Sequence, residues 1–199
     1  RNLEITEKLR DKSKKGTLLW VLDKTSTSMG GRALRRWLND PLVDVFEINK
    51  RLEAVKELKE NVILRGDAID ALKRVYDMER LSGRIAYGNA TGRDMISLKN
   101  SCKQLPEVKK VLSNCNSELL KELYENLDEL KDIYELIEEA IVDEPPMSIK
   151  EGGLIKIGYN EEIDHLKQAT TEGKTWIIEL EAREREATGI KGLKVGFNR

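Results

Sequence analysis

Apolar residues recur at every third or fourth position along most of the chain, with polar and charged residues between them. This spacing places the apolar side chains on one face of an α-helix, so the pattern predicts a succession of amphipathic helices. Four such stripes fall between residues 48 and 105: Ile48, Leu52, Val55 and Leu58; Leu64, Ala68, Leu72 and Val75; Leu81 and Ile85; and Met95, Leu98, Cys102 and Leu105. Pro106 lacks a backbone donor and crowds the preceding turn, and we expect it to end or kink the last of these helices.

A longer stripe of leucines and isoleucines lies between residues 119 and 141. It predicts either one long helix or a helix pair, with Asp128 as a candidate internal cap. The sequence Asp143-Glu144-Pro145-Pro146 is expected to stop it. Residues 152–158 then form a short apolar run bounded by glycines, which is too short for a helix and predicts an irregular or extended connection.

From Tyr159 the apolar positions alternate three and four residues apart, as in a heptad repeat with polar gaps. This seam comprises Tyr159, Ile163, Leu166, Thr170, Gly173, Ile177, Leu180, Glu184 and Ala187. A continuous helix over residues 159–188 would be about 45 Å long, and Gly173 is the point at which it would instead break into two helices. Thr188-Gly189 is expected to end the helix, and the alternating residues 193–197 predict the first strand of a further element.

The composition agrees with a helical chain, because 39% of the residues are hydrophobic, 36% are charged and 5% are aromatic. This balance suits helices with ionised outer faces and argues against a β-sandwich. Cys102 and Cys115 form no Cys-x-x-Cys pair or disulfide pattern, which indicates a reducing compartment. With no apolar stretch of membrane-spanning length and no signal peptide, we expect a cytoplasmic protein that does not enter a membrane. The chain starts at Arg1 rather than at a methionine, which predicts a fragment.

Charge is distributed unevenly, although the formal net charge is only -1. Residues 117–144 contain eleven acidic residues against two lysines, so this segment is expected to point away from any polyanion. The last ten residues hold Lys191, Lys194 and Arg199 and no acidic residue. These three are the candidate nucleic-acid contacts, and they would bind phosphates without reading base sequence. The alternative is that they are ordinary solvated residues.

Motifs for catalysis are missing from the sequence. Neither Gly30-Gly31 nor Gly152-Gly153 is followed by the lysine of a phosphate-binding loop, so ATP hydrolysis is not encoded here. His165, the only histidine, is expected to be a surface or seam residue rather than a general base. The acidic residues repeat as a solvated face would, and we predict no catalytic, cofactor or metal site. Three tryptophans fall within apolar stripes and are expected in the core: Trp20, Trp37 and Trp176.

The most distinctive stretch is the corner at residues 18–38, where two apolar runs flank a Thr/Ser/Gly turn and Arg32, Arg35 and Arg36 open the second run. At helical spacing these arginines would simply solvate the back of a buried helix. The corner also resembles a signature of the MutS mismatch-repair family. Further similar motifs follow in order: Asp77-Met78-Glu79-Arg80-Leu81, Arg84-Ile85, Gly88-Asn89-Ala90 and Arg93-Asp94-Met95; Gly152-Gly153, Gly158-Tyr159 and Glu162-Ile163-Asp164; and Glu184-Arg185-Glu186, Thr188-Gly189-Ile190 and Leu193-Lys194-Val195-Gly196-Phe197-Asn198.

This resemblance implies an all-α, multi-helical core or lever domain over residues 1–158, a long lever helix or helix pair over 159–189, and the truncated start of a β clamp over 190–199. In the family, the intact protein is a homodimer that encircles mismatched double-stranded DNA, hydrolyses ATP with Mg in another domain and signals to the repair factor MutL. The chain would then be a non-catalytic element, with no cofactor of its own, that couples the clamp to the ATPase domain. One departure is Ser28, where many relatives have proline, but Thr27 is still expected to cap the following helix.

Two other hypotheses stay open at this point. The chain would be a free-standing helical scaffold if it binds a partner helix through the seam of residues 159–187, or an enzyme if the acidic helix face is reactive. If the seam normally packs on a helix encoded downstream, this chain should leave the seam uncovered and self-associate.

Overall fold

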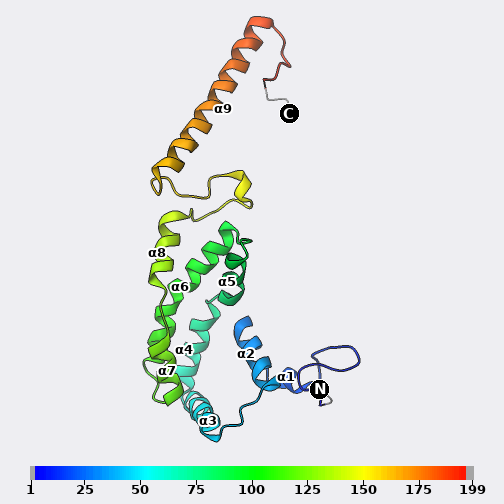
Figure 1. Cartoon of the computed structure of the whole chain (residues 1–199), viewed down its shortest axis with the longest axis vertical. Helices are drawn as coiled ribbons and strands as arrows, with labels where there is room; N and C mark the ends of the chain where they lie inside the picture. Colours follow the sequence, from blue (N-terminus) through cyan, green and yellow to red (C-terminus); the bar gives the residue numbers. More distant parts are fainter. Residues whose placement is uncertain (1–2, 196–199) are drawn as a thin grey trace. The chain divides into compact units, whose positions relative to one another are not determined.

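The structure is a computed structural model that describes residues 3–195. Within that range the chain forms nine α-helices, one short 3-10 helix and no β-strand, which confirms the predicted all-α class (Figure 1). The chain divides into two compact units, Arg1–Leu154 and Ile155–Arg199. No helix in the described range is both long and apolar enough to cross a membrane.

The first unit is a helical body built around α6. Its helices are α1 (Leu18–Leu22), α2 (Ser28–Asn39), α3 (Val45–Glu60), α4 (Val62–Lys73), α5 (Met78–Ala86), α6 (Gly92–Leu112), α7 (Glu118–Asn126) and α8 (Lys131–Ala140), followed by the 3-10 helix Ile149–Glu151. α6 packs against α4, α5, α7 and α8, while α3 packs against α4 and α7 (Figure 1). A buried cluster joins α3, α4, α7 and the segment that follows α6: Ala54, Leu64, Cys115 and Leu120.

The helix starts are set by polar side chains that accept hydrogen bonds from the first free backbone amides. The Thr27 hydroxyl accepts from the Gly30 amide at 3.0 Å, so the predicted cap of α2 is confirmed although Ser28 stands in the first helical position. Thr91 and Asp94 form a capping box at the start of α6, with each side chain accepting from the other's backbone amide. These capping side chains explain why the helices begin at these residues.

Pro106 does not end its helix, because α6 continues beyond it to Leu112. Proline removes one backbone donor, and the packing of α6 against four other helices outweighs that loss. The apolar stripe between residues 119 and 141 forms two helices, α7 and α8, rather than one long helix. Leu130 adopts the left-handed conformation with a φ of 50° between the two helices, and the Asp128 carboxylate accepts a hydrogen bond from its amide at 2.9 Å. Asp128 is therefore not the predicted cap, because the N-cap of α8 is Leu130 and no side chain caps that helix, but its carboxylate bonds the chain at the break.

The tryptophans are not core residues in this chain, so that prediction is wrong. Trp20, Trp37 and Trp176 are 49%, 47% and 63% exposed. Helical periodicity shows that each tryptophan lies on the apolar face of its own helix. It does not show whether another element covers that face. α2, which carries Trp37, has no buried residue, and the Trp37 ring is instead covered by the Arg51 guanidinium, whose carbon lies 4.1 Å from the ring centre.

The second unit contains α9 (Glu161–Thr188), a single helix of 28 residues that corresponds to about 42 Å at 1.5 Å per residue (Figure 1). Asn160 caps its start by accepting from the Ile163 amide, and Gly189 ends it in the left-handed conformation with a φ of 68°. The predicted stop at Thr188-Gly189 is confirmed. Gly173 does not break the helix, because it is an internal residue of α9 with ordinary helical backbone.

The predicted strand at residues 193–197 falls partly outside the described range. Residues 193–195 have no regular structure, and residues 196 and 197 are not described. The β clamp therefore stays a prediction.

Candidate functional site

The predicted phosphate contacts lie at the end of α9, in the segment 189–195 that we call the tip. Lys191 is an exposed residue of the turn that follows the helix, and Lys194 is exposed three residues later. Arg199 lies outside the described residues. Two of the three candidates are thus exposed residues of one short segment.

The tip folds back along the last turns of α9. The Arg185 Nε donates to the Leu193 carbonyl at 2.8 Å, and the Val195 amide donates to a Glu181 carboxylate oxygen at 3.0 Å. Arg185 and Glu181 also form an ion pair at 2.5 Å. Because this pair neutralises itself, the uncompensated positive charge of the tip comes from Lys191 and Lys194, which make no ion pair within residues 3–195. This exposed positive charge is the feature on which the predicted phosphate contact rests.

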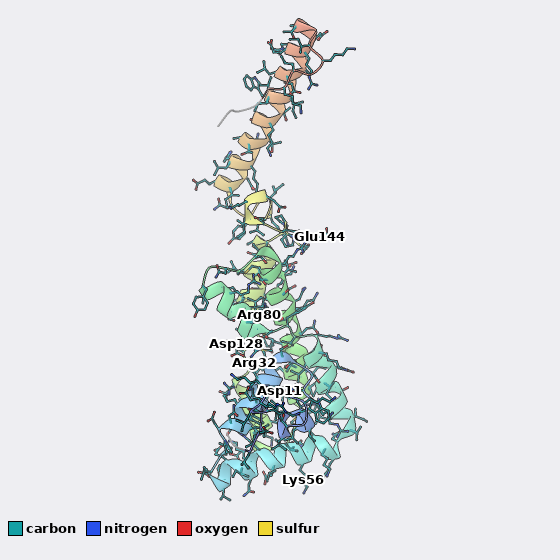
Figure 2. The ribbon with its side chains drawn as sticks, turned by 90° about the vertical axis from the view of Figure 1, so that its right-hand side faces the viewer. Asp11, Arg32, Lys56, Arg80, Asp128 and Glu144 are labelled. Carbon is teal, nitrogen blue, oxygen red and sulfur yellow. The ribbon has the colours of Figure 1, made fainter. Side chains whose placement is uncertain are left out.

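In the first unit, Arg32 joins the corner of α1 and α2 to the start of α5. Its guanidinium, labelled in Figure 2, donates to both carboxylate oxygens of Asp77 at 2.7 Å and to Glu79 at 2.7 and 3.0 Å. Asp77 is also the N-cap of α5, where it accepts from the Arg80 amide at 3.1 Å. The hydrogen bonds from Arg32 lower the pKa of Asp77 from 3.8 to about 2, against the opposing effect of burial.

The three arginines of the corner therefore do not share one role. Arg32 bonds to Asp77 and Glu79, Arg35 pairs with Glu7 at 3.1 Å, and Arg36 is exposed. The expectation that all three merely solvate a helix is wrong for Arg32, since a bidentate contact with Asp77 fixes the position of both side chains.

Two buried lysines hold the acidic helices against the body. The Lys50 ammonium on α3 contacts Glu122 and lies 3.6 Å from Glu118, both on α7. The Lys99 ammonium on α6 contacts Glu138 at 2.7 Å and Asp143 at 2.9 Å. Each lysine side chain is only 9% exposed. The acidic segment is therefore not simply a solvated face, because part of its charge neutralises lysines that would otherwise be buried without a partner.

Glu57 supplies a cap to a helix far from it in sequence. Its two carboxylate oxygens accept from the backbone amides of Asn116 at 2.6 Å and Ser117 at 2.8 Å, at the start of α7. The Ser117 hydroxyl makes no capping bond itself. Burial raises the pKa of Glu57, but the hydrogen bonds from Ser117 and Asn116 outweigh this effect and lower it overall. Sequence analysis missed this contact because nothing in the local pattern marks Glu57.

Reactive groups are sparse in the described part of the chain. Cys102 and Cys115 are free and buried, and burial raises the pKa of both thiols. His165 is an exposed residue of α9, as predicted. Residues 3–195 contain no group of three or more His, Cys, Asp or Glu side chains arranged to hold a metal ion. The contacts described above join helices of the first unit to one another.

Comparison with known proteins gives a consistent result. Residues 1–189 match the family model described as MutS domain III. Over all 199 residues the chain is 56% identical to the DNA mismatch repair protein MutS of Alkaliphilus oremlandii and 56% identical to that of Ruminiclostridium cellulolyticum. It is 55% identical to the DNA mismatch repair protein MutS of Clostridium tetani. Each alignment covers 100% of this chain and 23% of the relative, so the chain spans less than a quarter of the length of these proteins.

Proposed function

The chain belongs to the MutS DNA mismatch repair family, of which it forms domain III, and from this premise we propose that it is the core and lever that couples a DNA clamp to an ATPase domain in a longer protein. In this role the chain itself catalyses no reaction and binds no cofactor. ATP and Mg would be held by another domain of the parent protein. The structure contributes rigid elements and the contacts that connect them.

The observation that carries the proposal is the unbroken α9. A helix of 28 residues with a capped start and a glycine stop transmits a displacement at one end to the other, because bending it would disrupt its ladder of backbone hydrogen bonds. No residue of α9 is buried within the described chain, so the helix is not embedded in a core of its own.

The body also suits this role, since contacts between distant segments hold its helices in place. Arg32 connects α2 to α5, Lys50 connects α3 to α7, and Lys99 connects α6 to α8 and to Asp143 just beyond it. A force applied to one helix of such a network reaches its neighbours without any reactive group.

The partners follow from the same proposal. The parent protein would act in the cytoplasm as a homodimer on mismatched double-stranded DNA and would signal to MutL. Lys191 and Lys194 of the tip, with Arg199, would contact DNA phosphates where the lever meets the clamp.

The test is to break α9 in the full-length parent protein. Gly173→Pro removes a helical backbone donor and clashes with the carbonyl of Ala169, at a cost of about 3 kcal/mol to the helix. Gly173→Ala is the matched control, because nothing lies within 4 Å of the added methyl group. We expect Gly173→Pro to retain mismatch binding without nucleotide. ATP-driven release from DNA should slow at least about tenfold, which corresponds to an increase of about 1.4 kcal/mol in the activation free energy of release. Equal release rates in the two variants would overturn the proposal.

One observation favours the rival hypothesis of an interaction scaffold. Of the apolar seam residues on or next to α9, Tyr159 and Leu166 are 43% and 64% exposed. Ile163, Ile177 and Leu180 are half-buried, so the seam is only partly uncovered. Under that hypothesis the isolated chain binds a partner helix without any link to ATP. Light scattering from micromolar to millimolar concentration measures the self-association that an uncovered seam predicts, and a chain that stays monomeric would count against it.

A further inference from the structure

The loop of residues 143–154 is the last part of the first unit, and its two ends meet. The Val142 amide, just after α8, donates to the Leu154 carbonyl at 3.0 Å. Within the loop, Ser148 and Glu151 form a capping box around the 3-10 helix Ile149–Glu151. Glu144, labelled in Figure 2, lies near its start. The segment is thus a closed loop with internal structure rather than a loose linker.

Gly92, the first residue of α6, lies directly beneath this loop. It is buried, and a Cβ atom added there would lie 2.5 Å from the Leu154 Cδ1 and 2.6 Å from the Pro145 Cβ. The Leu154 methyl group can rotate away, but the Pro145 Cβ is part of a rigid ring, so the 2.6 Å contact requires the loop to move. By contrast, nothing lies within 4 Å of the position that a Cβ would take at Gly66 in α4 or Gly83 in α5. Gly92 is therefore a glycine for reasons of space rather than of backbone conformation.

α6 also holds the start of the loop. The Lys99 ammonium, two turns after Gly92, contacts Asp143 at 2.9 Å and Glu138 of α8 at 2.7 Å. The beginning of the loop is thus fixed to α6 by an ion pair, and Pro145 and Leu154 are fixed to it by close apolar contact. One helix determines where the loop starts and where the first unit ends.

We propose that Gly92, Pro145 and Leu154 form a seat that fixes the point at which the chain leaves the helical body for α9. All three are positioning residues, since they act by holding the last residues of the first unit against the start of α6. The interpretation of the seat as the attachment point of a lever rests on the proposed function. The contacts that form the seat do not depend on that function.

The test uses the 199-residue chain and hydrogen exchange at the Val142 amide, which reports whether the loop is closed. Gly92→Ala should raise this exchange rate at least about tenfold, the factor that corresponds to a packing loss of 1.4 kcal/mol. Gly83→Ala, the matched control in an open helical position, should leave it unchanged. Exchange in the buried part of α6, around Cys102, should be the same in both variants, because that part of the helix is remote from the seat.

A second variant guards against a general loss of folding in Gly92→Ala. Leu154→Ala removes the nearest atom of the seat without crowding it, and should also raise the Val142 exchange rate while exchange around Cys102 is unchanged. In the double variant, the fold-increase in the Val142 exchange rate should be smaller than the product of the fold-increases in the two single variants. The reason is that the shortened side chain at position 154 relieves part of the clash. Unchanged exchange in Leu154→Ala, or equal exchange in Gly92→Ala and Gly83→Ala, would overturn the seat.

The failure of this inference is distinguishable from the failure of the proposed function. The exchange experiment concerns only the loop in the chain itself, and its result does not depend on ATP or DNA. The Gly173→Pro experiment concerns only coupling in the parent protein, and it leaves the seat untouched because Gly173 lies within α9.

Discussion

The Arg32 guanidinium and the Asp77 carboxylate meet through two parallel hydrogen bonds of 2.7 Å, although the residues are 45 positions apart in the sequence. Asp77 uses one of the same oxygens to cap α5. One carboxylate thus serves both a local function, starting a helix, and a long-range function, holding the corner of α1 and α2.

These two functions of Asp77 can be separated by substitution. Asparagine is a good N-cap but carries no charge, so Asp77→Asn should lose the Arg32 ion pair and keep the cap, lowering the free energy of unfolding by up to about 1 kcal/mol. Asp77→Ala should lose about 1 kcal/mol more, because the cap goes as well. Urea unfolding of the two variants measures the difference. Equal stabilities would show that Asp77 does not cap α5 in solution.

The lowered pKa of Asp77 predicts a specific pH dependence. A carboxyl group with a folded pKa of about 2 and an ordinary value of 3.8 stabilises the fold fully above about pH 4, and this contribution is lost as the pH falls toward 2. The wild-type chain should therefore lose stability across this window more steeply than Asp77→Asn. Thermal unfolding at half-unit pH intervals measures both slopes, and parallel curves would contradict the assignment.

Glu57 is expected to stabilise the start of α7 from a distance. Glu57→Gln leaves one oxygen to serve two backbone amides, so the free energy of unfolding should fall by about 1 kcal/mol. Glu53→Gln on the same helix is the control, because Glu53 is exposed. Chemical denaturation of both variants gives the comparison. If Glu57→Gln were as stable as Glu53→Gln, the cap would have no energetic value.

The 199-residue chain should bind DNA weakly through its tip, without preference for a mismatch. If Lys191 and Lys194 each neutralise one phosphate, replacing both by alanine should reduce the slope of log affinity against log salt by about 2. Lys121→Ala, in the acidic helix α7, should leave the slope unchanged. Fluorescence anisotropy with matched and mismatched duplexes measures these slopes. Affinity that does not depend on salt, or that favours the mismatch, would contradict the phosphate role.

Local sequence patterns predicted much of the fold because they report on local physics. The cap at Thr27 and the stop at Gly189 are decided by residues within a few positions, and both appear as expected. The sequence leaves the continuity of α9 through Gly173 open, because one glycine costs a helix only about 1 kcal/mol and does not decide whether it breaks.

Long-range contacts were not predictable in the same way. Periodicity places Arg32 and Glu57 on helices, but it contains no information on partners 45 to 60 positions away. The same limit explains the error over the tryptophans, since an apolar stripe marks a face that needs a cover and not the cover itself. The phosphate contacts stay a prediction, because they rest on charge alone and charge predicts no geometry.

The rigidity of α9 is the central claim, because a lever that bends transmits nothing. Spin labels at Glu162→Cys and Glu184→Cys, exposed positions about six turns apart on one side of the helix, measure it directly by pulsed electron paramagnetic resonance. The two native cysteines are buried, which favours labelling of the introduced ones. A continuous helix predicts one narrow distance distribution centred near about 33 Å. A broad distribution, or a second population at shorter distance, would show that α9 bends and would contradict the account.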